Sequence, residues 1–342
     1  MVKKYLLNPI FVTIVVLIAM FWWGGAMALA LTAILAVLEV SLSFDNAIVN
    51  AKVLERMTPP WQRRFLTWGI LLAVVGVRFI LPIIIVSITT LTSPLAIANL
   101  AFSQPTIYAG MVAHVRPAIE AFGGMFLLMV ALRFFFDETK HIHWIYALER
   151  RLCRLGRIEA IEAAVALIIL LIMTGFPHTD RLVELLCGMI GIVIFILLDG
   201  FTVLLDTITG IKPQGSEDDG TEHTSTVSAS SPAVLFAYLE MIDVAFSLDG
   251  VVSAFAITIS VPIMVAGLGI GAYFVRSLTV AFAEGGVIKT LRYLEHGAHY
   301  AIGALAISML VSLSTEVPQW LTASIGLTFV SLAFFSSQRA TE

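Results

Sequence analysis

Charged residues are scarce in this sequence. Asp, Glu, Lys and Arg together make up 13% of its 342 residues, whereas hydrophobic residues make up 59%. Soluble domains carry about 25% charged residues, so charge is depleted roughly twofold. The excess of apolar side chains must face something other than water. The scarcity of charge therefore argues against a sizeable soluble domain and places any chemistry between membrane helices.

Cysteine is also scarce, and signals for other classes of protein are missing. The two cysteines, Cys153 and Cys187, provide neither a disulfide framework nor a C-x-x-C metal site. The net charge of −4 is small, and we expect no nucleic-acid partner. The first apolar run follows two lysines, as in a signal peptide, but the chain turns at Gly24-Gly25 into a second apolar run rather than a polar segment. We therefore expect the first run to remain as a membrane span.

Long apolar runs are what the sequence does contain. Runs of about 20 residues are long enough to cross a hydrocarbon core of ~30 Å as helices. We predict an all-α, polytopic membrane protein of about ten transmembrane helices, which form a single membrane domain over residues 1–342. The predicted spans are 6–24, 27–52, 66–90, 117–136, 159–176, 182–206, 232–259, 262–284, 293–313 and 318–337. The stretch 206–231, rich in Ser, Thr, Gly and acidic residues, is predicted to be a flexible cytoplasmic loop.

Positive charge is distributed unevenly between the predicted loops. If the N-terminus is inside, sixteen of the 20 Lys and Arg residues fall in inner segments and two, Arg116 and Arg181, in outer segments. This bias predicts that both termini are cytoplasmic, and we place the protein in the inner (plasma) membrane. Segment 137–158 holds most of the inner charge; we expect a topology determinant or a helix lying along the inner leaflet. The lipid bilayer is thus an expected partner, and self-association into a homo-oligomer is left open.

Two similar stretches indicate an internal duplication. They read Glu39-Val-Ser-Leu-Ser-Phe-Asp45-Asn46 and Asp243-Val-Ala-Phe-Ser-Leu-Asp249-Gly250. The following spans also align, through Val77-Arg78 with Val275-Arg276 and through Glu120 with Glu295. We predict two three-helix repeats, covering residues 27–136 and 232–313. The copies begin five predicted spans apart, an odd number, so they would cross the membrane in opposite directions, as in the inverted repeats of many secondary transporters.

The acidic residues of these motifs fall deep within predicted spans. A charge at the centre of a membrane helix costs about 2.5–3.5 kcal/mol on insertion scales. Four such carboxylates therefore cost on the order of 10 kcal/mol unless cations compensate them. Arg78 and Arg276 are expected as resident partners, and a bound metal ion or protons would supply the rest. We predict a metal site made of Glu39, Ser43, Asp45, Asn46, Glu240, Asp243, Ser247 and Asp249, with Arg78, Arg276, Asp199, Glu120 and Glu295 as accessory residues.

The periodicity of the motifs leaves their local structure open. Glu39, Ser43 and Asn46 share one helix face, whereas Asp45 lies about 100° away from it in an ideal helix. Either each helix has two polar faces, or it unwinds around Ser-x-Asp. We expect unwinding, because Asn and Gly tolerate non-helical backbone. We also expect Glu120 and Glu295 to open their helices, where the helix dipole favours a carboxylate.

All of the predicted ligands offer oxygen. They are carboxylate, hydroxyl and amide groups, and the motifs contain neither Cys nor His. Such a site suits hard divalent ions such as Mn²⁺, Mg²⁺ or Ca²⁺ better than it suits Zn²⁺ or Cu⁺.

The two motifs resemble those of the TerC family of membrane proteins. The first family motif, Glu-x-x-Leu-(Ser/Gly)-x-Asp-Asn, is matched by Glu39, Leu42, Ser43, Asp45 and Asn46, and the second, Asp-x-x-Phe-Ser-x-Asp, by Asp243, Phe246, Ser247 and Asp249. Three departures from the family pattern indicate a divergent branch. The chain has additional spans, it has Gly250 where the family often has Ser, and it lacks the Lys expected near Gly303. The resemblance implies metal-ion efflux, with Mn²⁺ as the leading substrate and a link to tellurite resistance.

Two other functions compete with transport. An intramembrane aspartyl hydrolase would use Asp45 and Asp249 as a dyad. The Gly-x-Gly-Asp motif of such enzymes is absent from the sequence, and we expect no enzymatic activity. A membrane scaffold that delivers metal or assembly factors to partners, without transporting ions, is the second alternative. We expect a secondary transporter that exports a divalent metal ion.

Overall fold

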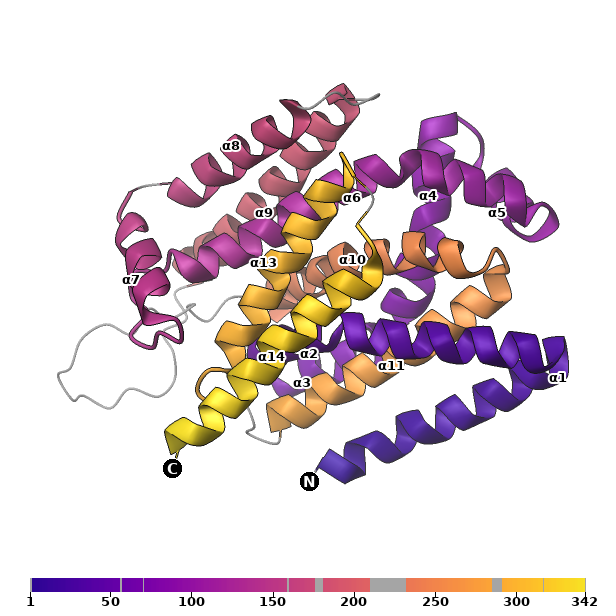
Figure 1. The fold of residues 1–342 in the computed structure, drawn as a ribbon, viewed down its shortest axis with the longest axis horizontal. Coiled ribbons are helices and arrows are strands. Elements are labelled where there is room, and N and C mark those ends of the chain that lie inside the picture. Colours follow the sequence, from indigo (N-terminus) through magenta and orange to yellow (C-terminus); the bar gives the residue numbers. More distant parts are fainter. Residues whose placement is uncertain are drawn as a thin grey trace.

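The protein is a bundle of helices (Figure 1). The computed structural model describes residues 2–55, 57–69, 71–158, 160–175, 181–209, 232–284, 291–315 and 317–341. Within these ranges the chain is predominantly helical and contains no β-strand, so the predicted all-α class is confirmed. Most of the predicted loop 206–231 lies outside the described residues.

The first helix, α1 (Val2–Leu42), is bent into two arms at Gly25. Gly25 has φ 70° and ψ −163°, a backbone conformation that glycine adopts at little cost. Figure 1 shows the two arms as a V. The predicted turn between the first two apolar runs is therefore confirmed.

The helix is interrupted a second time at Ser43, inside the first motif. There α1 ends, and α2 (Phe44–Leu54) begins with Ser43 as its N-cap residue. The main-chain hydrogen bonds from Ser43 N to Glu39 O (3.0 Å) and from Ala47 N to Ser43 O (3.1 Å) are retained, so the distortion is confined to about one residue. The second motif lies in α10 (Pro232–Ile257), which runs through it without interruption. The prediction that both motifs unwind is wrong for the second motif. In the first motif the helix is distorted at Ser43 but does not unwind further.

The third predicted span contains π-helix. It is built from α3 (Pro59–Arg64), the π-helices η1 (Phe65–Gly69) and η2 (Leu72–Ile80), and α4 (Leu81–Thr90). π-Helical segments are rare and occur mostly at functional sites. Pro82, near the start of α4, lacks the N–H that a regular α-helix would use at this position.

The middle of the chain contains two long helices and three shorter ones among the described residues. The elements are α5 (Pro94–Ser103), α6 (Pro105–Phe135), α7 (Tyr146–Leu155), α8 (Ile161–Gly175) and α9 (Arg181–Thr209). Helix α6 begins about three turns before the predicted start of its span, and Pro117 lies within it. Glu120 therefore lies in the interior of a helix, and the prediction that it opens one is wrong. Glu295, in contrast, does lie in the first turn of α13 (Leu294–Ser312), as predicted.

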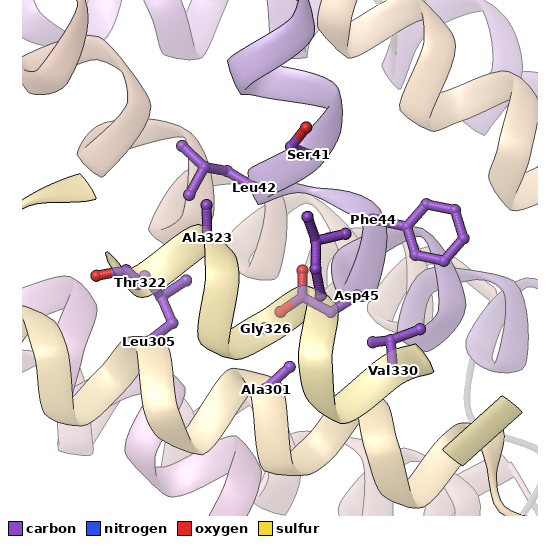
Figure 2. Close-up of a pocket in the computed structure, with 11 residues that line it drawn as sticks. Ser41, Leu42, Phe44, Asp45, Ala301, Leu305, Thr322, Ala323, Gly326 and Val330 are labelled. Atoms are coloured by element: carbon purple, nitrogen blue, oxygen red, sulfur yellow. The ribbon is translucent and has the colours of Figure 1, made fainter. Parts of the chain in front are cut away.

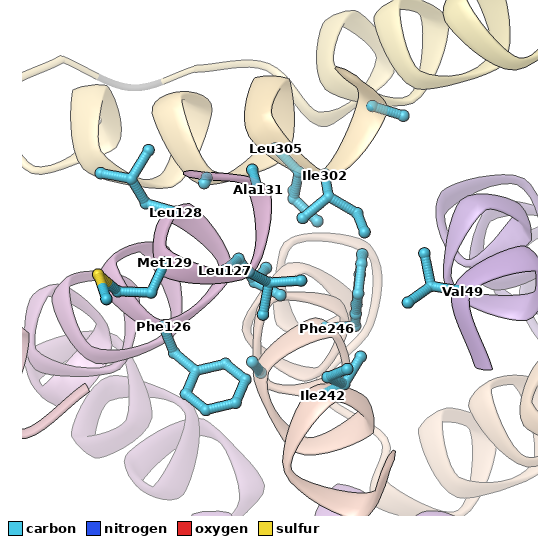
Figure 3. Packing of buried hydrophobic residues seen from close by; sticks show 14 of the residues in the cluster. Val49, Phe126, Leu127, Leu128, Met129, Ala131, Ile242, Phe246, Ile302 and Leu305 are labelled. Atoms are coloured by element: carbon cyan, nitrogen blue, oxygen red, sulfur yellow. The ribbon is translucent and has the colours of Figure 1, made fainter. Parts of the chain in front are cut away.

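Helices from both predicted repeats share one hydrophobic core. Figure 3 shows Val49 of α2, Phe126 of α6, Phe246 of α10 and Ile302 of α13 converging in it. The remaining elements are α11 (Val261–Glu284), which packs along α1, and α14 (Gln319–Thr341), which packs against α13. The core thus joins segments that are about 250 residues apart, as Val49 and Ile302 illustrate.

Six helical segments of the described chain are long and apolar enough to cross a membrane. They are Leu7–Leu42, Leu72–Thr90, Pro105–Phe135, Arg181–Gly200, Val261–Glu284 and Trp320–Ala340. Many of their large apolar side chains are exposed, among them Phe11 (69%) and Leu197 (63%). Exposed apolar surface on this scale fits contact with lipid rather than water. By length and composition, the described helices are compatible with a membrane protein.

Candidate functional site

Glu39 forms a buried ion pair with an arginine of the third predicted span. Its side chain, on α1, is 2% exposed and accepts a charge-assisted hydrogen bond from Arg78 Nη2 on η2. The Ser43 hydroxyl, one turn further on, donates to the same oxygen at 3.3 Å. Arg78 also donates from Nη1 to the main-chain carbonyl of Ala73 at 2.9 Å. The first motif is therefore tied to η2, as the presence of one buried cation in that span led us to expect.

A second arginine bridges two acidic residues of α10. Nη2 of Arg276, on α11, lies 3.0 Å from Glu240 Oε1 and 3.5 Å from Asp243 Oδ2. The same nitrogen donates to the carbonyl of Gly69 at 3.2 Å, and the guanidinium carbon lies 3.7 Å from the centroid of the Phe65 ring. Arg276 is only 2% exposed. This buried charge is thus held by two carboxylates, one carbonyl and an aromatic face.

Both arginines bind carbonyls of the π-helical span. Gly69 is the last residue of η1, and Ala73 is near the start of η2. The periodicity of the sequence did not predict these π-helices. The only local signals are Gly69, Gly76 and Pro82, which loosen the α-helical pattern without specifying its replacement.

A side-chain hydrogen bond connects the two motifs directly. Asn46, on α2, donates from Nδ2 to Oδ1 of Asp243 on α10 at 3.0 Å. Asn46 is 1% exposed and Asp243 is 4% exposed. The structure therefore brings together Asn46, Asp243, Glu240 and Arg276 in one buried network, as the predicted convergence of the motifs required.

Small residues let the helices approach these acids closely. A Cβ atom on Gly271 of α11 would lie 2.3 Å from Glu39 Cγ, and one on Gly250 of α10 would lie 2.8 Å from Glu39 Oε2. A Cβ on Gly69 would lie 2.6 Å from Glu240 Oε1. Glu39 thus packs against both α10 and α11. At Gly271 a side chain would collide with the base of Glu39, whereas at Gly250 and Gly69 it would displace the end of a Glu side chain.

Several buried polar atoms around the network have no hydrogen-bond partner within the described parts of the chain. They are Asn46 Oδ1, both side-chain polar atoms of Asn50, Ser247 Oγ, Glu240 Oε2, Arg78 Nε and Arg276 Nη1. Most buried polar atoms in folded proteins are hydrogen-bonded to protein or to ordered water. Four of these seven atoms are oxygens, so the network retains unused capacity to bind a hydrated or bare cation.

Asp45 lies apart from this network. Its side chain is 6% exposed and accepts a hydrogen bond of 3.0 Å from the main-chain N–H of Asn46. Figure 2 shows it beside a small pocket that is also lined by Thr322 and Gly326 of α14 and by Ala301 of α13. Asp249 lies on α10, but its side chain is outside the described residues. The four motif acids are therefore not seen as a single cluster.

The accessory acids have partners elsewhere. Arg116 Nε lies 2.6 Å from Glu120 Oε1, one turn away on α6. Glu295 pairs with Lys52 of α2 at 3.1 Å. Asp199, on α9, is 3.4 Å from Arg133, and its side chain is 38% exposed. None of these contacts leads into the network around Asp243.

The described side chains do not form a ready-made metal cage. Within the ranges that the structure covers, no group of three or more His, Cys, Asp or Glu side chains is arranged to hold a metal ion. Instead, Glu39, Glu240 and Asp243 are paired with Arg78 and Arg276. A metal ion would have to compete with a guanidinium group for these carboxylates.

A second buried cluster was not predicted from the sequence. In this cluster the segment that follows α6 packs against α13. The centre of the cluster is the fully buried carboxylate of Glu149 on α7. Glu149 accepts hydrogen bonds from Trp144 N (3.3 Å), Ile145 N (3.2 Å) and the Tyr300 hydroxyl (3.3 Å). It forms an ion pair with Lys140 (2.9 Å), and His296 Nε2 lies 3.4 Å from its second oxygen. The segment expected to lie along the inner leaflet is therefore anchored to the bundle.

The charges of this cluster affect one another. Burial opposes ionisation of Glu149, but the hydrogen bond and charge of Lys140, with the charge of His296, outweigh it and lower the pKa of the carboxyl below its usual value of 4.5. Burial also lowers the pKa of the Lys140 ammonium, because Glu149 offsets the loss of hydration only in part. The folded state thus favours the ionised form of Glu149 over its protonated form.

Comparison with known proteins gives one family. A family model described as "Protein of unknown function (DUF475)" matches residues 44–342. The match includes Asn46, Arg78, Asp243 and Arg276 and begins just after the Glu39–Ser43 turn. No curated protein and no solved structure matches the chain.

Proposed function

The chain belongs to the DUF475 family, and we propose that it is a secondary transporter that exports a divalent metal ion, with Mn²⁺ as the leading substrate. The observation that carries this proposal is the buried hydrogen bond between Asn46 and Asp243, beside the Glu240–Arg276 ion pair. Ionisable groups between membrane helices are costly and typically mark ion pathways.

The balance of charge in the network favours a cation as its ligand. The carboxylates of Glu39, Glu240 and Asp243 face the guanidinium groups of Arg78 and Arg276, which leaves one negative charge. A charge in surroundings of low polarity interacts strongly with any ion that enters. The unpaired oxygens near these groups are hard donors of the kind that Mn²⁺, Mg²⁺ and Ca²⁺ bind. The proposed ion pathway also includes Ser43, Asp45, Ser247 and Asp249.

We further propose that the two motif-bearing segments, 27–136 and 232–313, are inverted repeats within a bundle of about ten spans. The ion pairs support this proposal. Glu39 pairs with Arg78, and Asp243 pairs with Arg276. In the alignment of the two motifs, these four residues occupy corresponding positions. One interaction is thus made twice, once in each proposed repeat.

The resemblance of the motifs to those of the TerC family supports metal export in particular. The resemblance implies efflux of metal ions, and the bias of Lys and Arg toward the predicted inner segments supports the proposal that both termini are cytoplasmic. Export from the cytoplasm, rather than uptake, is therefore the direction proposed.

A non-transporting scaffold is the second candidate, and one observation favours it. Each acid of the network already has an arginine partner, and the described side chains form no ready metal cage. A chain with this arrangement could hold its helices together by ion pairs alone and present metal or assembly factors to partner proteins.

Manganese export from cells separates the two candidates. Cells loaded with excess Mn²⁺ would express the wild type, Asp45→Asn or Asp249→Asn at matched levels, with intracellular Mn²⁺ measured by mass spectrometry. A transporter predicts that the wild type lowers intracellular Mn²⁺ and that both variants are inserted but inactive. A scaffold predicts no difference between cells with and without the wild-type protein. If the wild type moves no Mn²⁺, the same measurement with Mg²⁺ and Ca²⁺ decides whether the transporter proposal is abandoned.

A further inference from the structure

Arg276 occupies the position that a bound cation would be expected to take. Its Nη2 nitrogen is surrounded by Glu240 Oε1 at 3.0 Å, Gly69 O at 3.2 Å and Asp243 Oδ2 at 3.5 Å. Two carboxylates and one main-chain carbonyl are the oxygen donors that hard divalent ions bind, at about 2.0–2.6 Å. They come from η1 and α10, which approach each other around this nitrogen.

The contacts of Arg276 are not those of a well-satisfied structural arginine. Structural pairs between arginine and a carboxylate are typically bidentate, with two N–H groups on two oxygens. Here Nη2 serves all three acceptors, whereas Nη1 and Glu240 Oε2 are buried without a hydrogen-bond partner among the described residues. Unsatisfied buried groups of this kind weaken the pairing and lower the cost of replacing the guanidinium.

The guanidinium also has a second partner that does not depend on the acids. Its central carbon lies 3.7 Å from the centroid of the Phe65 ring, which is fully buried. Arginine is attracted to the face of an aromatic ring, with an interaction of about 2 kcal/mol or more when it is desolvated. Phe65 can therefore hold the guanidinium nearby once its Nη2 has moved away from Glu240 and Asp243.

From this geometry we infer that Arg276 is a tethered substitute for the transported cation. When no ion is bound, its Nη2 neutralises Glu240 and Asp243. An incoming divalent cation replaces that nitrogen between Glu240, Asp243 and the Gly69 carbonyl, and the returning guanidinium displaces the ion on the other side of the membrane. The inference rests on the proposed function and adds the group that competes with the ion. Arg78 is not assigned this role, because among the described side chains it contacts a single carboxylate, that of Glu39.

A rescue experiment tests this competition. Binding of Mn²⁺ to the purified full-length protein in detergent would be measured by electron paramagnetic resonance of the free ion. Glu240→Gln is expected to weaken binding at least about tenfold, because one carboxylate is lost and Arg276 still neutralises the other. Adding Arg276→Gln to Glu240→Gln removes the competitor, and the double variant is expected to bind Mn²⁺ to within about threefold of the wild type.

The double variant is the decisive one. It exchanges one buried pair of opposite charges for two neutral amides, so it avoids the uncompensated charge that could unfold Arg276→Gln alone. Arg157→Gln, at an exposed position on the segment after α7, serves as the matched control and is expected to bind like the wild type. If the double variant binds Mn²⁺ no better than Glu240→Gln, the inference is overturned while the proposed function stands. If the wild type and all variants bind no Mn²⁺ in this assay, and no Mg²⁺ or Ca²⁺ by isothermal titration calorimetry, both are overturned.

Discussion

Asn46 donates a hydrogen bond of 3.0 Å to Asp243, a residue 197 positions further along the chain. The bond joins the first acidic motif to the second at a buried position between α2 and α10. It is the most direct structural link between the two halves of the proposed repeat. Any cation held by Asp243 would lie close to both halves at once.

The loss of this bond should destabilise the protein more than the loss of a similar amide that is not bonded. Asn46→Ala leaves Asp243 without its neutral donor, and a buried hydrogen bond to a charged group contributes about 1.5–3 kcal/mol. Asn50→Ala, one turn away, is the matched control, because the Asn50 amide is buried without a hydrogen-bond partner in the described structure. Thermal unfolding in detergent measures both. A cost for Asn50→Ala that equals or exceeds that of Asn46→Ala would contradict the assignment.

The close approach of α11 to Glu39 makes a second prediction about stability. Gly271→Ala would place a Cβ 2.3 Å from Glu39 Cγ, near the base of that side chain, so the helices must separate. Overpacking of this kind costs about 1–3 kcal/mol. Gly110→Ala, in α6, meets nothing within 4 Å and is expected to be neutral or slightly stabilising. The melting temperatures of the two variants check this, and equal values would show that α11 does not pack on Glu39 as described.

Much of the ion-pair network was predictable from the sequence. Arg78 and Arg276 were identified because buried carboxylates within membrane spans need compensating cations. Which arginine pairs with which carboxylate was not predicted; the structure pairs Arg78 with Glu39, and Arg276 with Glu240 and Asp243.

Other parts of the site could not have been predicted. The carbonyls of Gly69 and Ala73 accept hydrogen bonds from Arg276 and Arg78 because the backbone there is π-helical. π-Helix depends on tertiary packing more than on local propensity. The position of Asp45 beside α14 depends on how α13 and α14 cover the first motif. Glu149 accepts a hydrogen bond from Tyr300, 151 residues further along the chain, and no local sequence pattern specifies such a contact.

The Glu149 cluster gives a prediction about pH. The pKa of Glu149 is lower in the folded protein than its usual value, so ionised Glu149 stabilises the fold. That contribution is complete above about pH 4.5 and is lost as the pH falls through the lower pKa of the folded state. Glu149→Gln should therefore lower stability by about 1–3 kcal/mol at pH 7, and the difference from the wild type should shrink below pH 4.5.

The measurement is thermal unfolding of the wild type and Glu149→Gln in detergent across that range of pH. Glu138→Gln, whose side chain is 57% exposed, is the matched control and should show little difference from the wild type at any pH. A difference between wild type and Glu149→Gln that stays constant down to low pH would mean that the charge of Glu149 does not stabilise the fold.

The most direct test of the account is Mn²⁺ flux through the purified protein in proteoliposomes that contain a Mn²⁺-sensitive dye. The account predicts that wild-type protein carries Mn²⁺ across the bilayer, that Asp243→Asn stops the flux while the protein remains folded, and that Glu138→Gln transports like the wild type. Asp243→Asn removes the negative charge that would hold the ion and leaves an amide oxygen that can still accept the Asn46 hydrogen bond, so the variant separates loss of the ion site from loss of the link between the motifs. Flux through Asp243→Asn equal to that of the wild type, or no flux of Mn²⁺, Mg²⁺ or Ca²⁺ through the wild type, would contradict the account.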